Sequence, residues 1–247
     1  MNATGNTILI TGGGSGIGRA LAHRFHDLSN RVIVAGRRPE ALDETVAGRK
    51  GMAFLVLDVG DPANIAAFTA RILTEHPDLN VLINNAGIMR AEDLTAERDL
   101  ADAEATIVTN LLGPIRLTNA LVSHLARAPD AAIVNVSSGL AFVPLTSTPT
   151  YSATKAAIHS YTVSLRQQLR GRIEVIELVP PAIQTGLTPG QANNSDYMQL
   201  GVFVEEAMVL FKQQPTPVEI CVDRVGFLRH AEAEGRFDRA VAMLNAR

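Results

Sequence analysis

Tyr151 and Lys155 are the residues of this chain whose types and spacing most directly suggest chemistry. Side chains four positions apart lie on the same face of a helix, so the lysine ammonium can approach the tyrosine hydroxyl. A nearby cation favours phenolate and lowers the tyrosine pKa from its ordinary value of about 10. A phenol with a lowered pKa is a usable general acid or base. The alternative is an ordinary surface pair, so the interpretation needs support from elsewhere in the chain.

A glycine-rich segment near the N-terminus is the second candidate site. The apolar run Thr7–Ile10 predicts a buried strand, and Thr11-Gly-Gly-Gly-Ser-Gly-Ile-Gly18 follows it. A strand, a glycine turn and a helix in this order are typical of dinucleotide binding. Gly12 allows the tight turn, Gly16 lets the backbone approach a pyrophosphate, and Gly18 permits close packing of helix on strand. The alternative is a glycine loop with a purely structural role.

Short β-branched runs alternate with helical patterns along the chain, which is typical of βαβ units and a parallel sheet. We expect an α/β fold with three layers (α/β/α), in which a doubly wound sheet has about seven strands. The expected strands are residues 7–11, 31–36, 53–57, 80–84, 131–136, 173–178 and 218–222. The expected helices are residues 16–28, 40–48, 62–75, 97–126, 151–169, 203–213 and 237–244. Ligands of such sheets bind beyond the carboxyl ends of the strands.

Composition and charge favour one enzyme-sized domain, which we place at residues 1–247. The net charge of -3 gives no reason to expect nucleic acid or an anionic membrane as a partner. We find no apolar run long enough to span a membrane and no signal segment, and the one cysteine, Cys221, cannot form an internal disulfide. These features predict a cytoplasmic protein.

The chain resembles the short-chain dehydrogenase/reductase family over almost its full length. The resemblance rests on motifs that occur in the family's order: Thr-Gly-x-x-x-Gly-x-Gly at 11–18, Asp58-Val59, Asn84-Asn85-Ala86-Gly87, Asn110, Ser138, Tyr151-x-x-x-Lys155, and Pro180-Pro181 through Thr185. It implies a Rossmann-type fold and an oxidoreductase that transfers hydride between a nicotinamide cofactor and a carbonyl or alcohol.

The resemblance implies four catalytic residues: Asn110, Ser138, Tyr151 and Lys155. Tyr151 would donate a proton to the carbonyl oxygen, and Ser138 would hydrogen-bond the same oxygen. Lys155 would lower the Tyr151 pKa and bind the nicotinamide ribose, while Asn110 would bend its helix and hold a water that connects Lys155 to solvent. Ser137 is expected to bond backbone near the strand end instead.

The resemblance also implies cofactor contacts along the whole edge of the sheet. Asp58 would accept a hydrogen bond from the adenine amino group. For Asn84 the alternative to a cofactor contact is a structural role, in which its side-chain amide joins the ends of neighbouring strands. Pro180-Pro181 replaces the usual Pro-Gly and removes a backbone N–H, a variant that resembles the subgroup of oxidoreductases associated by name with D-alanine transfer. The full set is Gly12, Ser15, Gly16, Ile17, Gly18, Arg37, Asp58, Val59, Asn85, Ala86, Gly87, Tyr151, Lys155, Pro181, Ile183 and Thr185.

The end of the second strand predicts which cofactor is used. A carboxylate there would bind the ribose hydroxyls of NAD and repel the 2′-phosphate of NADP. This chain has Gly36 in that place and Arg37 next to it. Because a guanidinium suits phosphate, we expect NADP(H) in preference to NAD(H). The alternative is that Arg37 and Arg38 are both solvated surface charges.

Two segments are expected to form the substrate pocket, one between Ser138 and Tyr151 and the other a lid at 185–213 rich in turn-forming residues. A passive surface loop is the alternative to the lid. Neither 139–154 nor 185–204 contains Arg or Lys, so we expect a small, neutral, hydrophobic ketone or secondary alcohol as substrate. The apolar residues expected to line the pocket are Leu140, Phe142, Val143, Leu145, Leu187, Tyr197, Met198, Leu200 and Phe203.

Apolar residues on more than one face of the 97–126 helix predict a homodimer or homotetramer. They are Ile107, Leu111, Leu112, Ile115, Leu117 and Leu121, and the alternative is that the sheet alone buries them. A second class of function is a non-catalytic dinucleotide-binding regulator or scaffold of the same fold. Such a protein would have no need of Ser138, Tyr151, Lys155 and Asn110 together.

Overall fold

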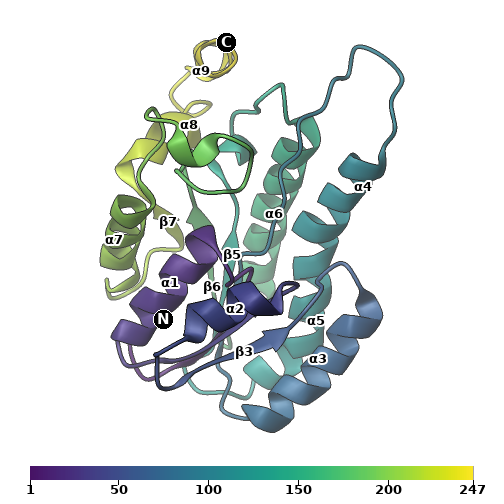
Figure 1. The fold of residues 1–247 in the computed structure, drawn as a ribbon. Helices are drawn as coiled ribbons and strands as arrows, with labels where there is room; N and C mark the ends of the chain where they lie inside the picture. The colour runs from purple at the N-terminus through teal and green to yellow at the C-terminus, as the bar shows by residue number, and fades with distance from the viewer. Residues whose placement is uncertain (247) are drawn as a thin grey trace.

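One parallel sheet with helices on both faces forms the molecule, and the computed structural model describes residues 1–246 of it (Figure 1). The strands follow the order β3-β2-β1-β4-β5-β6-β7 and every neighbouring pair is parallel. This confirms the predicted Rossmann-type sheet. The strands are β1 Thr7–Thr11, β2 Arg31–Gly36, β3 Met52–Val56, β4 Val81–Asn84, β5 Ala132–Val136, β6 Glu174–Val179 and β7 Glu219–Cys221.

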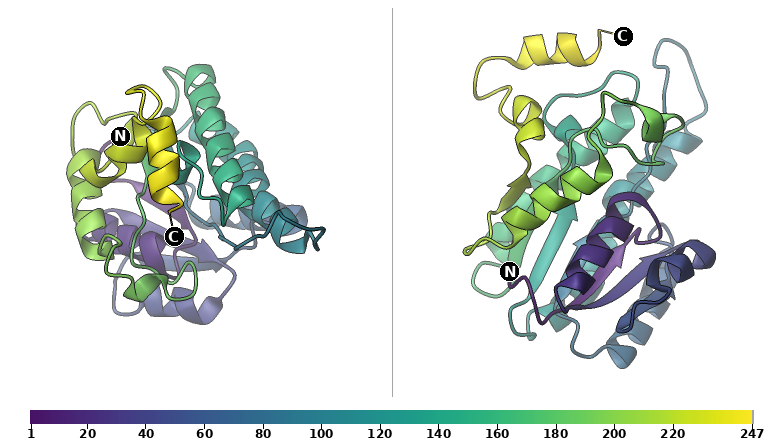
Figure 2. Two further views of the ribbon diagram at one scale, coloured as in Figure 1. Left: turned by 90° about the horizontal axis from the view of Figure 1, so that it is seen from above. Right: turned by 60° about the vertical axis from the view of Figure 1, so that its left-hand side comes forward.

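The helices divide between the two faces of this sheet. Helices α1, α2 and α7 pack on one face, while α3, α5 and α6 pack on the other (Figures 1 and 2). No helix among residues 1–246 is long and apolar enough to cross a membrane. The bounds are α1 Gly16–Asp27, α2 Pro39–Val46, α3 Pro62–Glu75, α4 Ala101–Ile107, α5 Gly113–Leu125, α6 Pro149–Gln168, α7 Leu200–Phe211, α8 Gly226–Arg229 and α9 Phe237–Leu244.

The helix expected at 97–126 is instead two α-helices joined by a π-helical turn at Val108–Leu112. Asn110 lies in this turn, and its amide Oδ1 accepts a hydrogen bond from the Ile88 N–H at 2.9 Å. Its Nδ2 donates to the Ile88 carbonyl oxygen at 2.8 Å. A π-turn adds one residue to the helical turn, a feature that hydrophobic periodicity does not show. The prediction of one regular helix over 97–126 was therefore wrong, while the irregularity lies at Asn110, where the resemblance implied a local bend.

The predicted lid, residues 185–213, has two structurally different parts. Residues 185–199 contain only a short 3-10 turn, and their base is fixed by hydrogen bonds between Gln184 N and Met198 O and between Met198 N and Ala182 O. Helix α7 forms the remainder and packs its buried face into the core. Movement over the substrate therefore stays a prediction for residues 185–199.

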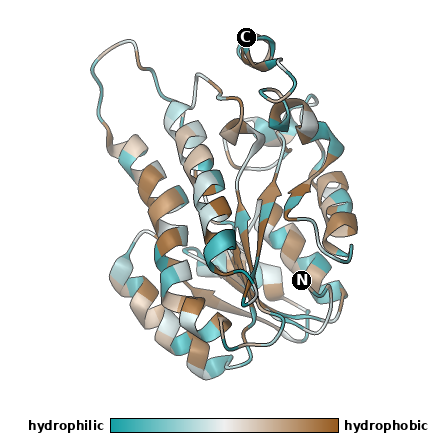
Figure 3. Cartoon of the chain, turned by 180° about the vertical axis from the view of Figure 1, so that it is seen from behind, coloured by the Kyte–Doolittle hydropathy of each residue, from teal (hydrophilic) through white to brown (hydrophobic). Residues whose placement is uncertain are grey.

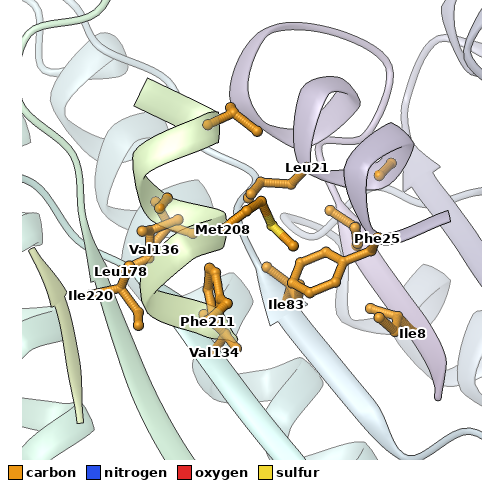
Figure 4. Close-up of a cluster of buried hydrophobic side chains, with 14 of the residues drawn as sticks. Ile8, Leu21, Phe25, Ile83, Val134, Val136, Leu178, Met208, Phe211 and Ile220 are labelled. Carbon is orange, nitrogen blue, oxygen red and sulfur yellow. The ribbon is translucent and has the colours of Figure 1, made fainter. Parts of the chain in front are cut away.

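Phe25 of α1 and Phe211 of α7 anchor the helices on one face of the sheet (Figure 4). Their ring centroids are 5.4 Å apart with an interplanar angle of 67°, an edge-to-face arrangement that adds to the free energy of burial. The strands beneath are largely hydrophobic, whereas the helices alternate hydrophobic and hydrophilic residues (Figure 3). This packing fixes the carboxyl-terminal turn of α1 against α7 and the sheet.

We expect Phe211→Ala to lower the free energy of unfolding by about 3–5 kcal/mol, because a fully buried aromatic ring leaves a cavity and α1 loses its edge-to-face partner. Urea denaturation measures the loss. Val209→Ala is the control, since Val209 lies on the same helix and is 62% exposed, and we expect it to change stability by less than about 0.5 kcal/mol. Equal stability of the two variants would contradict the role of Phe211 in anchoring α7 against α1.

Candidate active site

A cavity of about 510 Å³ opens at the carboxyl ends of the strands. Its volume lies in the ordinary range for small-molecule sites. It brings together residues from the ends of β1 to β6 and from the start of α6. Gly18 and Asn110 do not line it. The expected site residues that do line it are Gly12, Ser15, Gly16, Ile17, Arg37, Asp58, Val59, Asn85, Ala86, Gly87, Ser138, Tyr151, Lys155, Pro181, Ile183 and Thr185.

The glycine-rich loop has the close packing that a pyrophosphate cradle requires. Gly12 has a φ of +67°, and a Cβ there would lie 2.9 Å from the Ala86 Cα. A Cβ on Gly18 would lie 2.4 Å from the Gly12 carbonyl oxygen, so Gly18 serves packing and not ligand contact. Ser15 is the N-cap of α1 without a side-chain capping bond. The free N–H groups of the first helical turn suit an anion, so the cradle fits a dinucleotide.

Asn84 and Asn85 both tie strand ends together. The Asn85 Nδ2 donates to the Thr11 carbonyl oxygen at 2.9 Å, and the Thr11 hydroxyl accepts from the Asn85 and Ala86 N–H groups, each at 3.0 Å. These bonds join β1 to β4, where the strand order reverses. Asn84 Nδ2 donates to Asn135 Oδ1 at 2.9 Å, the structural role considered for it. Asn85 therefore combines a structural tie with a place on the cavity wall.

Two arginines follow β2 at the cavity. Gly36, Arg37 and Arg38 all line it, and no carboxylate ends the strand. Both guanidinium groups are on exposed residues, and neither forms an ion pair within residues 1–246. Asp58, after β3, also lines the cavity and accepts a hydrogen bond from the Gly60 N–H at 2.8 Å. Because both guanidinium groups lack an ion-pair partner in the described part of the chain, the part of the cavity next to Arg37 and Arg38 is suited to an anion.

Tyr151 and Ser138 form the polar centre of the opposite end. Tyr151 is 8% exposed, and burial raises the pKa of its phenol to about 12, while a hydrogen bond with the Ser138 side chain lowers that pKa. Lys155 Nζ lies 5.5 Å from the Tyr151 ring centroid but donates to the Val136 carbonyl oxygen at 2.8 Å. The Tyr151 pKa is therefore raised, where a lowered value was expected, because burial is the largest effect.

Lys155 is itself buried, and this lowers the pKa of its ammonium to about 8, against the opposing charge of Glu177. Glu177 also corrects the expectation for Ser137. The Ser137 hydroxyl donates to the Glu177 carboxylate and not to backbone. A buried acid on the sixth strand thus lies directly behind the serine pair and the lysine.

Glu92 fixes the start of α6, immediately before Tyr151. Its carboxylate accepts hydrogen bonds from the Thr150 N–H at 3.0 Å and the Thr150 hydroxyl at 2.8 Å, and Arg98 donates to it at 2.7 Å. These bonds hold the pKa of Glu92 below its ordinary value against desolvation, which raises it. Asn110 acts from the other side, because its Nδ2 also lies 3.3 Å from the Thr154 hydroxyl. The first turns of α6 are therefore held from both sides.

Most of the apolar residues expected to line the substrate pocket lie elsewhere. Val143, Met198 and Phe203 are buried in the hydrophobic core, and only Leu187 of that set lines the cavity. Phe142 packs its ring 4.8 Å from the His159 ring and 4.5 Å from the Arg229 guanidinium. Apolar pattern alone does not distinguish a residue that faces a pocket from one that faces the core.

Sequence reasoning missed several residues of the site. Arg90 lines the cavity and lies 3.5 Å from Asp102, and its segment follows the fourth strand, which ends at the same sheet edge. Its position after the fourth strand could have indicated Arg90 as a site residue. In the same way, its position next to Arg37 could have indicated Arg38. Glu92 and Glu177 had no comparable signal, because their partners lie far away in the sequence.

Comparisons with known proteins agree with this geometry. The short chain dehydrogenase family profile matches residues 6–196. The uncharacterized oxidoreductase DltE of Bacillus subtilis is 39% identical over 250 residues, which cover 99% of this chain and 98% of that protein. Sulfoacetaldehyde reductase 2 of Chromohalobacter salexigens is 33% identical and covers 73% of this chain and 74% of its own.

A solved structure also aligns with nearly the whole chain. It is a short chain dehydrogenase from Burkholderia cenocepacia J2315 in complex with NADP, with a TM-score of 0.82 and 25% identity over 97% of this chain and 98% of that one. The DltE match confirms the expected resemblance to the subgroup associated by name with D-alanine transfer. The family profile and the extent of these matches show that this chain is an oxidoreductase of the short-chain dehydrogenase/reductase family.

Proposed function

We propose that this protein is an NADP(H)-dependent carbonyl reductase or alcohol dehydrogenase in which Tyr151 is the general acid and base. The observation that carries the proposal is that Tyr151, Ser138 and Lys155 line the same cavity as the glycine-rich cradle. Two hydroxyl groups beside a dinucleotide cradle are suited to bind and protonate a carbonyl oxygen. Lys155 places a cation next to them.

The side chains divide the proton chemistry among them. The nicotinamide, when bound, supplies or accepts the hydride. Ser138 donates a hydrogen bond to the carbonyl oxygen and stabilises the negative charge that develops there. Tyr151 gives its proton to that oxygen, and the Lys155 ammonium stabilises the phenolate that remains. Burial raises the Tyr151 pKa, so the phenol carries the proton that carbonyl reduction requires at neutral pH.

The preference for NADP(H) is supported by charge. Arg37 and Arg38 supply two guanidinium groups with no partner carboxylate within residues 1–246, and no acid at the end of β2 opposes a phosphate. A 2′-phosphate would accept charge-assisted hydrogen bonds from either guanidinium group. The complex of the Burkholderia relative with NADP supports the same choice.

We propose a small, neutral ketone or secondary alcohol with hydrophobic substituents as the substrate. Arg90 lines the cavity, and its proximity to Asp102 supports a neutral ligand because its charge already has a partner. A carbonyl compound with an anionic group is the competing substrate, since a sulfoacetaldehyde reductase is among the relatives. A panel of aryl and alkyl ketones, with sulfoacetaldehyde included, distinguishes them by kcat/KM.

We further propose that α4 and α5 form a contact between subunits of a homodimer or homotetramer. Ile107 is 40% exposed, and Leu111, Leu112 and Ile115 are only partly covered. Leu117 and Leu121 are fully buried in the core of their own chain and do not contribute. Exposed apolar side chains on neighbouring helical turns support a protein contact.

A non-catalytic dinucleotide-binding regulator is the competing function. It requires the glycine-rich cradle but not the contacts between Tyr151, Ser138 and Lys155. Purified protein with NADPH and the ketone panel, followed at the nicotinamide absorbance, distinguishes the two. Cofactor binding without turnover of any carbonyl would favour the regulator.

We expect Tyr151→Phe to reduce kcat for ketone reduction by about a hundredfold or more, because it removes the proton donor. Binding of NADPH, measured by fluorescence titration, should change little. Tyr161→Phe is the matched control, since Tyr161 lies on the same helix and does not line the cavity. Turnover by Tyr151→Phe at the wild-type rate would contradict the mechanism.

We expect Arg37→Ala to raise KM for NADPH by about tenfold or more while KM for NADH changes little, because only NADPH carries the phosphate. Initial rates with each cofactor measure the effect. Arg71→Ala, on the outer surface of α3, is the control for loss of one positive charge. If the wild type prefers NADH and Arg37→Ala has the same preference, Arg37 does not bind the 2′-phosphate of NADP(H).

A further inference from the structure

We propose that Glu177 is a positioning residue for the reaction, which holds the strand end that carries Ser138 and places a negative charge under the face of α6 that carries Lys155. The proposal rests on the proposed function of the same site. It assigns a role to a buried acid that does not line the cavity and that none of the steps above uses.

Glu177 occupies an unusual place for a charged residue. It lies in the middle of β6, opposite Asn135 of β5 and Glu219 of β7, and its side chain is 0% exposed. Strands that are covered on both faces are usually apolar, and burial of a carboxylate costs several kcal/mol unless partners stabilise it. Packing alone therefore gives no reason for an acid at this position.

The hydrogen bonds of Glu177 fix the serine pair from behind. Its Oε1 accepts from the Ser137 hydroxyl, and the Ser137 N–H donates to the Leu178 carbonyl oxygen at 2.9 Å. Ser137 is thus held by side chain and main chain at once. Because Ser138 follows directly, its backbone has little freedom to move. Ser138 then caps a short 3-10 turn, where its Oγ accepts from the Leu140 N–H at 3.1 Å.

The charge of Glu177 acts on α6. Lys155 and His159 lie one helical turn apart on the face of α6 that covers β6, and the Glu177 Oε2 accepts from His159 Nδ1 at 2.8 Å. Burial lowers the Lys155 pKa to about 8, and the Glu177 charge is the effect that opposes this. An ammonium with a pKa so close to neutral pH depends on that opposing charge. Loss of the charge would leave part of the lysine deprotonated.

Apart from His159, whose Nδ1 lies 2.8 Å from Oε2, the titratable groups around Glu177 leave this charge available to Lys155. Glu219 is paired through two hydrogen bonds with Arg229, at 2.7 and 2.9 Å. Burial raises the pKa of the Cys221 thiol to about 12, so Cys221 adds no charge at neutral pH. Arg166 directs its guanidinium to the Val175 and Val218 carbonyl oxygens.

The same cluster contains ligand types that suit a divalent cation. Donor atoms of His159, Glu177 and Glu219 lie within 4.8 Å of one another. However, Arg229 already binds both carboxylate oxygens of Glu219, and Lys155 adds a second cation near Glu177. Two positive side chains oppose a bound metal, so the observations favour the positioning role.

The test is the pH profile of kcat/KM for ketone reduction by Glu177→Gln, which keeps the size and the oxygen that can accept from Ser137, replaces the other oxygen with an NH2 donor, and removes the charge. Removal of the anion lowers the Lys155 pKa further, so the ammonium is lost at lower pH. We therefore expect the alkaline limb of the profile to move down by about one pH unit. Glu219→Gln removes the same charge from the neighbouring strand and should leave the limb in place.

Two further variants separate the two parts of the role. Ser137→Ala removes the hydroxyl contact without a change of charge, and it should lower kcat at every pH without moving the limb. Glu177→Asp keeps the charge but withdraws it by one methylene, and it should move the limb less than Glu177→Gln does. If Glu177→Gln does not fold, judged by circular dichroism, Glu177→Asp carries the test, and an unmoved limb in it overturns the proposal.

The outcomes also distinguish this inference from the proposed function. If the wild-type protein turns over no carbonyl compound with either cofactor, the proposed function itself fails. If the wild type is active and Glu177→Gln loses activity equally at every pH, the carboxylate has only a structural role and the inference is wrong.

Discussion

Burial of a parallel sheet on both faces is the constraint on which the rest of this molecule depends. Helices cover both sides, so the strands leave polar groups few places except the edge where they end. The hydrogen bonds from Thr11 to Asn85 and Ala86 hold that edge together at the point where the strand order reverses. The cradle and the hydroxyl pair can therefore lie in one cavity although they are more than a hundred residues apart in the sequence.

Burial also sets the electrostatics of the site. It disfavours charge on both members of the Tyr151 and Lys155 pair, raising the first pKa and lowering the second. For Tyr151 to act as an acid beside a charged Lys155, other residues must therefore supply hydrogen bonds to the phenol or negative charge near the ammonium. Ser138 supplies this for the phenol, and Glu177 supplies it for the ammonium. The chemistry suggested by the spacing of Tyr151 and Lys155 thus depends on residues of β6 and of the segment after β5, which the spacing alone does not reveal.

The sequence predicted the fold well because its signals are local. Strands β1 and β2 begin and end where the apolar runs do, and α3 and α9 match the expected bounds. Most of the failures involve partners distant in the sequence, and the π-helical turn is a local feature that hydrophobic periodicity does not show. Ser137 bonds an acid forty positions away, and Phe203 has the same apolar character whether it faces a substrate or the core. The direction of the Tyr151 pKa shift depends on burial, which no motif contains.

The π-helical turn at Val108–Leu112 sets the relative phase of two helices. It contains one residue more than an α-helical turn, so the faces of α4 and α5 are offset by about 100° from those of a continuous helix. A helical wheel drawn through both would therefore assign Ile107 and Ile115 to the wrong relative sides. The surface that these helices expose is set by the added residue, and a chain lacking it would expose a different face with the same side chains.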